Sequence, residues 1–351
     1  MSKKPNRKTL FLVCLALLEV NLASAGRNSD REEGTASVNT SSSPNAIQPA
    51  GCEATSQIAV QVLGSGGPLN GGGRASTSYL IWLEGHPAIV VDMGVGSAVN
   101  LTRAGASARD VDAILLSHLH PDHVSDLPGF LWSAQVLERS RPLIIVGPAG
   151  NDYFPDTKTF MSRLFGVGGA FPVMQRLLSD DAKFHLDIRT IETRTVRSIA
   201  VLQRDGVKIS AYPVSHGHAP SLAYRIERSG FSIVFAGDQN GLDSGFASFA
   251  RDADILILHT ALSPLAENHP FAEVIGLPHR LGKLAADANA KKVILSHLMG
   301  FPADDASAAD FSLSNPDALL KAVREVYRGD VSLASDLECI HAALQDSRGH
   351  S

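Results

Sequence analysis

The sequence predicts a layered α/β protein, and the order of its strand and helix patterns is the main reason. Two apolar runs at 79–83 and 88–91 are joined by Glu84-Gly85-His86-Pro87, a pattern typical of a β-hairpin. From residue 113 onward, short apolar runs of strand length alternate with segments of helix length. With 351 residues and 44% apolar content, the chain can bury a large core.

Each expected element follows from an apolar pattern and from the residues that end it. The expected strands are 58–63, 79–83, 88–91, 113–116, 142–146, 207–214, 222–227, 231–236, 254–258 and 292–295. The expected helices are 97–104, 157–165, 246–252, 277–289 and 317–327. Because neither a repeat nor a linker-like composition follows residue 56, we expect one folded domain over residues 57–345.

The first 56 residues differ from the rest in composition. Residues 1–25 combine a basic start, an apolar run at 10–18 and Ala23-Ser24-Ala25, the three parts of a secretory signal peptide. Glu19 interrupts the apolar run before it is long enough to cross a membrane, so a cleaved signal is favoured over an anchor. Residues 26–56 are rich in Ser, Thr, Asn and Gly and are expected to form a flexible leader. We therefore expect a periplasmic or secreted protein with no membrane span after cleavage.

Cleavage after Ala25 would make the chain more acidic. It removes four basic residues and one acidic residue, so 31 Lys+Arg become 27, 36 Asp+Glu become 35, and the net charge moves from -5 to -8. An acidic protein has no general attraction to a polyanion, so nucleic acid is not the expected partner. The sequence does not set the oligomeric state, and a homodimer stays open.

Two cysteines, Cys52 and Cys339, would remain after cleavage. In an oxidising compartment they could close a disulfide across 287 positions (339 minus 52). In the chain-entropy model such a loop restricts the unfolded chain by about 4 to 5 kcal/mol. Two unrelated buried thiols are an equal alternative.

The strongest chemical signal is Ser117-His118-Leu119-His120-Pro121-Asp122-His123, directly after an expected strand. In an extended segment, side chains at i and i+2 point the same way, so His118 and His120 can bind one metal together. Pro121 is expected to fix a turn that lets Asp122 and His123 face a second position. Three imidazoles and a carboxylate at this spacing predict a metal site.

Further candidate donors each follow an apolar run. His216, Asp238 and His297 lie just past the expected strands 207–214, 231–236 and 292–295. A site assembled at one edge of a sheet would show this recurrence. A donor set rich in imidazole favours zinc, although manganese and iron also suit it.

On these motifs the chain resembles the metallo-β-lactamase superfamily, and within it the tRNase Z-like and arylsulfatase-like branch. The resemblance covers about residues 57–342 and rests on the following segments: Leu63-Gly64-Ser65-Gly66-Gly67-Pro68, Val91-Asp92-Met93-Gly94, the motif at 118–123, His216-Gly217 with Ala223-Tyr224-Arg225-Ile226, Phe235-Ala236-Gly237-Asp238, and Leu295-Ser296-His297. It implies a four-layer αββα sandwich and two divalent metal ions.

The resemblance also implies a role for each donor. His118, His120 and His216 would bind the first metal, Asp122, His123 and His297 the second, and Asp238 would bridge the two. The spacing back from Tyr224 favours His216 over the neighbouring His218. Asp92 is expected to orient a ligand imidazole rather than bind metal, with a simple turn cap as the alternative. Of His259, His269 and His279, none has a spacing argument for a catalytic role.

Two departures from the tRNase Z pattern bear on the substrate. Family members usually carry a histidine about 22 residues before the last ligand, and here that position is Ile275. Bacterial members typically insert a long tRNA-clamping arm between the ligands that match His216 and Asp238. Only 21 residues separate those two in this chain, and two expected strands already use most of them.

The sequence therefore predicts an exported, binuclear metal-dependent hydrolase of small anionic esters, either phosphodiesters or sulfate esters. Water between two divalent ions loses a proton near neutral pH and becomes a nucleophile, which Asp122 would help to orient. The alternatives are a tRNase Z-like endoribonuclease, a lactonase or β-lactamase-type acyl hydrolase, and a metal-binding protein without catalysis. The last is disfavoured because all seven donor positions are filled.

Overall fold

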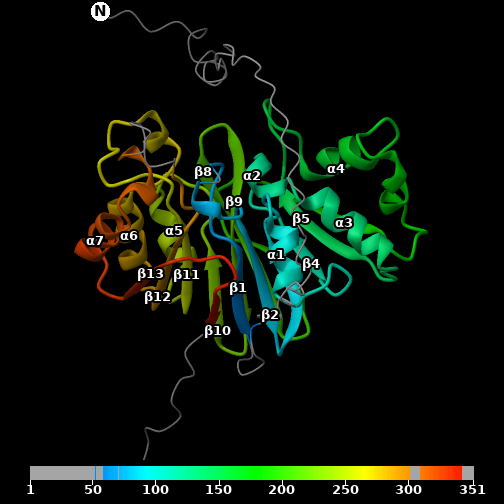
Figure 1. Ribbon diagram of the computed structural model, residues 1–351, viewed down its shortest axis with the longest axis horizontal. Coiled ribbons are helices and arrows are strands. Elements are labelled where there is room, and N and C mark those ends of the chain that lie inside the picture. Colours follow the sequence, from blue (N-terminus) through cyan, green and yellow to red (C-terminus); the bar gives the residue numbers. More distant parts are fainter. Residues whose placement is uncertain (1–51, 53–57, 70, 301–308, 342–351) are drawn as a thin grey trace, which may run out of the picture. The chain divides into compact units, whose positions relative to one another are not determined.

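The computed structural model describes residues 52, 58–69, 71–300 and 309–341, and two seven-stranded sheets organise them (Figure 1). The first sheet has, in spatial order, β14 (Cys339–His341), β1 (Ile58–Gly64), β2 (Ser78–Leu83), β3 (His86–Val91), β4 (Ala113–Leu115), β5 (Leu143–Pro148) and β6 (Leu186–Ile191). The second has β13 (Asp330–Leu333), β12 (Lys292–Ser296), β11 (Ile255–His259), β10 (Phe231–Phe235), β9 (Ala219–Arg228), β8 (Val207–His216) and β7 (Ile199–Arg204).

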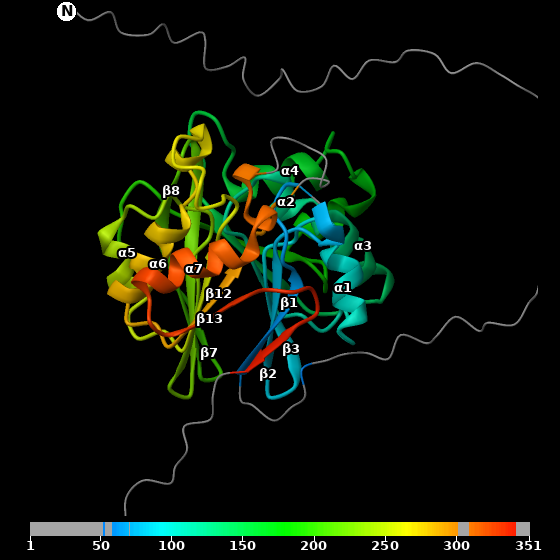
Figure 2. The same ribbon diagram turned by 60° about the vertical axis from the view of Figure 1, so that its left-hand side comes forward.

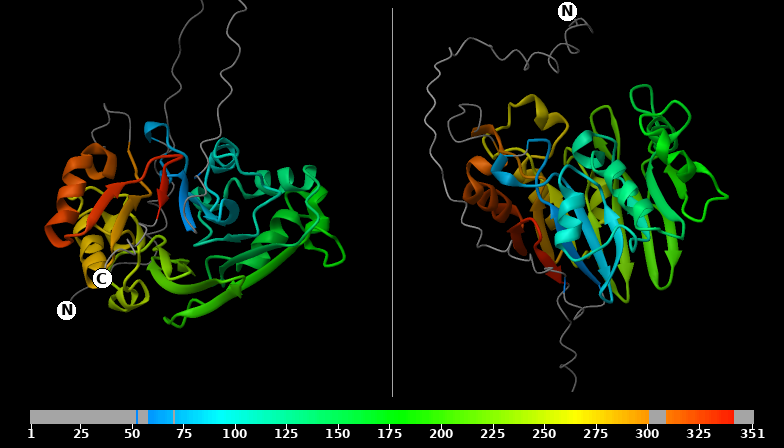
Figure 3. Two further views of the ribbon diagram at one scale, coloured as in Figure 1. Left: turned by 90° about the horizontal axis from the view of Figure 1, so that it is seen from below. Right: turned by 45° about the vertical axis from the view of Figure 1, so that its right-hand side comes forward.

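Helices cover the outer face of each sheet. Between strands of the first sheet lie α1 (Ser97–Arg103), α2 (Pro121–Val124), α3 (Leu127–Val136), α4 (Thr157–Phe165) and the 3-10 helices η1 (Gly71–Gly73) and η2 (Pro172–Leu178). Between strands of the second lie α5 (Ser244–Phe249), α6 (Pro278–Asp287), α7 (Pro316–Val326), η3 (Pro270–Glu273) and η5 (Ser312–Ser314). Figure 2 shows α1 and α3 on one side of the strands and α5, α6 and α7 on the other, and Figure 3 shows the same layers in two further views.

The burial of strand β1 explains why the two sheets stack. All seven of its residues are buried, and alternate side chains go to different cores. Val60 and Val62 join the cluster between the sheets, which also contains Tyr224 and Phe235 from the second sheet, whereas Ala59 packs in the cluster under the helices of the first sheet. A strand that is apolar on both faces needs a cover on both, and the four-layer αββα sandwich provides it. The predicted fold class is confirmed.

Parallel strand pairing brings the loops that carry candidate functional residues to one edge of the sandwich. Strands β3, β4, β5 and β6 pair in parallel, and so do β10, β11, β12 and β13. The carboxyl ends of neighbouring parallel strands meet at the same edge, where loops can carry functional side chains. Within the described ranges, none of the helices combines the length and apolar character that crossing a bilayer requires.

Two expectations differ from the structure, and a third lies outside the residues it describes. The turn expected at Pro121 is the first turn of α2, because proline at the first helical position needs no backbone N–H. Helix α3 and strands β6, β7, β13 and β14 were not expected. The expected signal peptide and nearly all of the leader lie outside the described residues.

Candidate metal centre

The segment after β4 supplies four donors from one short stretch. His118 is fully buried, and His120 is in an extended conformation immediately before α2. Helix α2 then carries Asp122 and His123, both buried, in its first turn. The extended start points two imidazoles one way, and the helical turn directs the next two donors to a neighbouring position.

The second sheet supplies three donors from three separate strand ends. His216 is the last residue of β8, Asp238 follows β10 across Ala236 and Gly237, and His297 directly follows β12. His297 has a φ of 60°, a left-handed conformation that costs energy for a residue with a side chain. The chain therefore turns sharply out of the strand at this donor.

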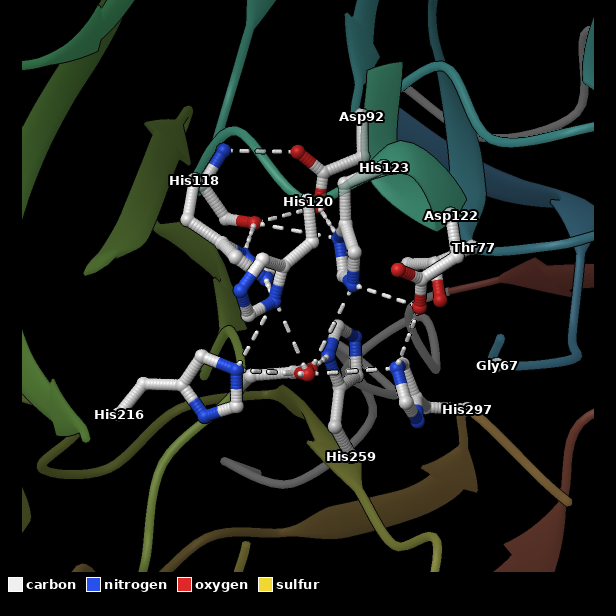
Figure 4. A network of polar contacts seen from close by, with 12 residues as sticks. Gly67, Thr77, Asp92, His118, His120, Asp122, His123, His216, His259 and His297 are labelled. Atoms are coloured by element: carbon white, nitrogen blue, oxygen red, sulfur yellow. Dashed lines mark hydrogen bonds and ion pairs between the residues drawn. The ribbon is translucent and has the colours of Figure 1, made fainter. Parts of the chain in front are cut away.

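The donors form two groups of three. In the first, His120 Nδ1 lies 2.9 Å from His118 Nε2 and 3.3 Å from His216 Nε2. In the second, Asp122 Oδ2 lies 3.2 Å from His297 Nε2 and 3.4 Å from His123 Nε2. Figure 4 shows the first three rings converging on one side of the centre and the second group on the other.

Asp238 lies between the two groups and contacts both. Its Oδ2 is 3.5 Å from His216 Nε2 in the first group and 3.3 Å from His297 Nε2 in the second. Its carboxylate also lies 4.0 Å from His118 Nε2 and 3.7 Å from His123 Nε2. The structure thus brings together all seven donors named from the sequence, with one carboxylate shared.

The geometry fits metal cations. Donor atoms about 3.3 Å apart are what a tetrahedral ion with bonds of about 2.0 to 2.1 Å requires. His123 Nε2 is buried, faces the centre and has no hydrogen-bond partner, a cost that a cation would remove. A cluster of imidazoles and carboxylates without cysteine suits zinc or another divalent ion.

The pKa values of His118, His120, Asp122 and Asp238 agree with this fit. Burial lowers the pKa of His118 and, with the neighbouring His216, brings the pKa of His120 to about 4, so both rings are neutral at neutral pH. Burial raises the pKa of Asp122 and Asp238, but the charge of neighbouring imidazoles outweighs it and holds the pKa of both carboxyl groups well below the usual range. At His123 and His297 burial alone would lower the pKa, but the nearby carboxylates outweigh it and raise the pKa, so a cation would have to displace a proton from each of these two rings. Neutral imidazoles and ionised carboxylates are the forms that bind metals.

Asp92 holds one ligand ring in place. Its carboxylate accepts hydrogen bonds from the Ser117 backbone N–H at 2.7 Å, the Ser117 hydroxyl at 2.7 Å and His123 Nδ1 at 2.8 Å. The last bond fixes the His123 tautomer so that Nε2 faces the metal position. Asp92 itself has a φ of 57°, and this strained backbone turns its side chain toward the ligand loop.

His259 is a member of the centre that sequence reasoning missed. It is buried at the end of β11, and its Nδ1 donates to Asp238 Oδ1 at 2.7 Å. The Tyr79 hydroxyl lies 3.0 Å from His259 Nε2, and burial raises the pKa of Tyr79, so the neutral phenol donates there. His259 follows the same rule as His216 and His297, a histidine where an apolar strand ends, and that signal could have found it.

The other singled-out histidines lie outside the donor groups. His218 is exposed at the tip of the turn between β8 and β9, where its ring packs 4.3 Å from the ring of Tyr153. His269 caps the start of η3, and His279 is exposed on α6. Ile275, at the position where the tRNase Z pattern has a histidine, is buried in an apolar cluster with Leu277 and other residues.

A cavity of about 590 Å³ lies away from this centre. It is lined by residues at the starts of β3, β4 and β5, such as His86, Ala113 and Pro142, whereas the metal donors lie beyond the ends of strands. Its charged side chains largely pair with one another, as in the ion pair between Arg228 and Glu84. We therefore place the functional site by donor geometry rather than by this cavity.

Comparison with known proteins supports the family and the fold. A model of the metallo-beta-lactamase superfamily matches residues 71–240. Ribonuclease Z of Mycobacterium bovis BCG is 31% identical over 212 residues, 58% of this chain and 70% of that protein. Ribonuclease Z of Mycobacterium sp. strain KMS is 32% identical over 188 residues, 52% of this chain and 61% of that protein, so the match spans less than two thirds of this relative. Human tRNase Z, short form, superposes with a TM-score of 0.61 at 20% identity over 82% of this chain and 100% of that one.

The αββα sandwich and its histidine and aspartate cluster define a metallo-hydrolase. This chain belongs to the metallo-β-lactamase superfamily, and its homologues include ribonuclease Z enzymes.

Proposed function

We propose that this chain is a ribonuclease Z-like phosphodiesterase that uses two divalent cations, with zinc the first candidate, to cleave RNA. The observation that carries the proposal is the position of Asp238 between two complete groups of donors. A carboxylate shared by two ions sets them side by side, which is the arrangement that suits in-line displacement at phosphorus.

The residues of the centre have separable tasks in this proposal. His118, His120 and His216 would hold one cation, and Asp122, His123 and His297 the other, with Asp238 between them. When bound, the cations would supply Lewis acidity toward the phosphate oxygens. Asp122 stays ionised, so its carboxylate can accept a hydrogen bond from an attacking water and orient it.

We propose RNA as the substrate in place of the small anionic esters that the sequence predicted. The sequence argument used export, net charge and the missing tRNA-clamping arm, none of which describes the donors of the centre. Relatives that are 31% and 32% identical to this chain are ribonuclease Z enzymes, and they give the RNA reading more support. The centre itself suits either substrate, because both present the same phosphodiester group to the cations.

Hydrolysis of small phosphodiesters or sulfate esters remains a second candidate, on one structural observation. Between His216 and Asp238 the chain forms β9 and β10 with tight turns, so a tRNA-clamping arm has no place there. Without such an arm, a long folded RNA would lose a binding contact, whereas the binding of a small diester would be unaffected.

One experiment separates the two candidates. The purified, zinc-loaded chain is given precursor tRNA and bis(p-nitrophenyl) phosphate, with p-nitrophenyl sulfate and a lactone alongside. We expect cleavage of precursor tRNA near its 3′ end with a higher kcat/KM than for the small diester. The reverse order would favour the second candidate, and activity on neither phosphodiester would overturn the proposal. Asp238→Asn serves as the control for metal-dependent turnover.

Two proposals about the whole protein accompany this function. We propose export after removal of residues 1–25 and a flexible leader over 26–56, both from sequence composition, and a homodimer stays open. Intact mass of the protein recovered from the producing cells would test the first, because cleavage leaves Gly26 as the first residue.

A further inference from the structure

Beside the metal centre, the short loop of residues 151–154 between β5 and α4 carries two neighbouring aromatic side chains. Phe154 packs against the ligand His120, with ring centroids 5.5 Å apart. Tyr153 packs against His218, with centroids 4.3 Å apart and planes 32° from parallel. His218 lies two residues after the ligand His216, so the Tyr153–His218 pair adjoins the first group of donors.

Hydrogen bonds from Asn151 fix this loop. Its side-chain carbonyl accepts from the backbone N–H groups of Tyr153 and Phe154, both at 2.9 Å, and its amide donates to the His218 carbonyl at 2.8 Å. Gly150 packs so closely that a Cβ there would lie 2.5 Å from the Asp156 nitrogen. The loop is thus joined to the β8–β9 turn by one hydrogen bond and one ring contact.

Tyr153 is nevertheless 62% exposed. The exposed ring stands beside the first group of donors, where it offers a large amphipathic contact surface to a bound ligand. One face of its ring rests on His218, which leaves the other available to a planar group. Aromatic rings with a free face are what proteins use to stack nucleobases in single strands.

We propose that Tyr153 and His218 form a stacking platform for a nucleobase of the substrate next to the scissile phosphate. The proposal rests on the function proposed above, since it requires a phosphodiester held at the donors that adjoin the platform. The platform recognises the flat face of a base rather than its edge, so it would accept any base. It sets specificity for nucleotide esters over alkyl esters and takes no part in bond breaking.

The test compares two chromogenic substrates that release the same p-nitrophenolate. One is the p-nitrophenyl ester of thymidine 5′-monophosphate, and the other is methyl p-nitrophenyl phosphate, which has no base. In the zinc-loaded chain, Tyr153→Ala should lower kcat/KM for the thymidine ester about tenfold, the usual size of one base stacked on one ring. The methyl ester should change less than about twofold, because the metal centre is intact.

Matched variants complete the test. Tyr153→Phe keeps the ring and should leave both substrates unchanged, and Trp132→Ala, at an exposed aromatic of α3, should do the same. Equal losses on both substrates, or no loss on the thymidine ester, would overturn the platform. If the wild type hydrolyses neither ester, cleavage of precursor tRNA decides whether the proposed function fails. Binding of thymidine 5′-monophosphate, with inorganic phosphate as the reference, then tests the platform alone: Tyr153→Ala should weaken only the nucleotide, and equal binding would reject it.

Discussion

The two sheets contribute to the metal centre in different ways. The first sheet supplies four donors, His118 to His123, from a single loop after β4. The second supplies three donors, His216, Asp238 and His297, from the ends of three strands spread over 81 positions (297 minus 216). The loop divides its donors between the two groups, and each strand end then completes one group or, in Asp238, joins both.

This difference shows that the positions of the loop donors depend on local sequence, whereas those of the strand-end donors depend on the topology of the sheet. The loop brings its donors together by local geometry, with an extended step followed by one helical turn. The strand-end donors meet only because β8, β10 and β12 place their ends at the same edge of the sandwich. Changes to the strand-end donors therefore test the assembly of the centre one group at a time.

The largest effect is expected at the shared donor. Asp238→Asn keeps the shape of the side chain but removes its charge, which both groups use. Metal content should fall from about two ions to one or fewer per chain, and kcat/KM should fall about a thousandfold, the scale of losing metal-based charge stabilisation. Elemental analysis and single-substrate kinetics measure the two. A variant that keeps two ions and wild-type activity would show that Asp238 bridges nothing.

A smaller, paired effect is expected at the unshared strand ends. His216→Ala opens the first group and His297→Ala opens the second, and each should lose about one ion and about a hundredfold in kcat/KM. With cobalt in place of zinc, the ion that stays differs between the variants: it keeps two imidazoles in His216→Ala and three in His297→Ala. Identical absorption spectra of the two variants would contradict the division into two groups.

A smaller effect than at the donors is expected at His259, which contacts the metal centre only through Asp238. His259→Phe removes the N–H that donates to Asp238 Oδ1 and should weaken metal affinity about tenfold. His259→Gln retains a donor and should recover part of the affinity, and Tyr79→Phe, one contact further away, should change it least. Competition with a chelating dye measures the affinity. If all three variants fold and bind metal like the wild type, His259 does not position the bridge.

The same contrast explains which parts of the molecule the sequence predicted. Interior strands such as β1 and β10 are continuous apolar runs, and the ten expected strands all correspond to observed ones. The four strands that were not expected, β14, β6, β13 and β7, are the edges of the two sheets. Edge strands are short or half-exposed, as β7 is, so their side chains lack the pattern that burial imposes.

For the site, the sequence indicated the residues of the candidate donor groups better than residues that contact the donors. The seven donors stand at strand ends or in a dense motif, and the pattern alone brought them to notice. His259 stands at a strand end too, but its partner Asp238 lies on another strand, and their contact depends on the pairing of β10 with β11. Helix α3 has proline and glycine in its first turn, which hid it although proline suits that position.

The smallest effect on activity is expected from loss of the disulfide bond at the edge of the first sheet, which does not contact the metal centre. The structure joins Cys52 to Cys339 of β14, with 5.5 Å between their Cα atoms and 287 positions between them in sequence. None of the seven donors lies on β14, so Cys339→Ser should keep its metal and most of its kcat/KM. Its stability should fall by about 2 to 5 kcal/mol, because the unfolded chain regains the freedom of a very long loop.

Denaturant unfolding of the oxidised protein and its variants tests this link. Cys52→Ser, Cys339→Ser and the double variant should lose the same stability, because each of them removes the same disulfide bond. The effects of the two single substitutions should therefore not add in the double variant. Reducing agent should lower the wild type to that level and leave all three variants unchanged. Additive losses in the double variant, or two free thiols in the denatured, unreduced wild type, would mean that the cysteines act separately. If the variants without the disulfide bond also lost bound metal, the edge strand β14 would contribute to the assembly of the metal centre.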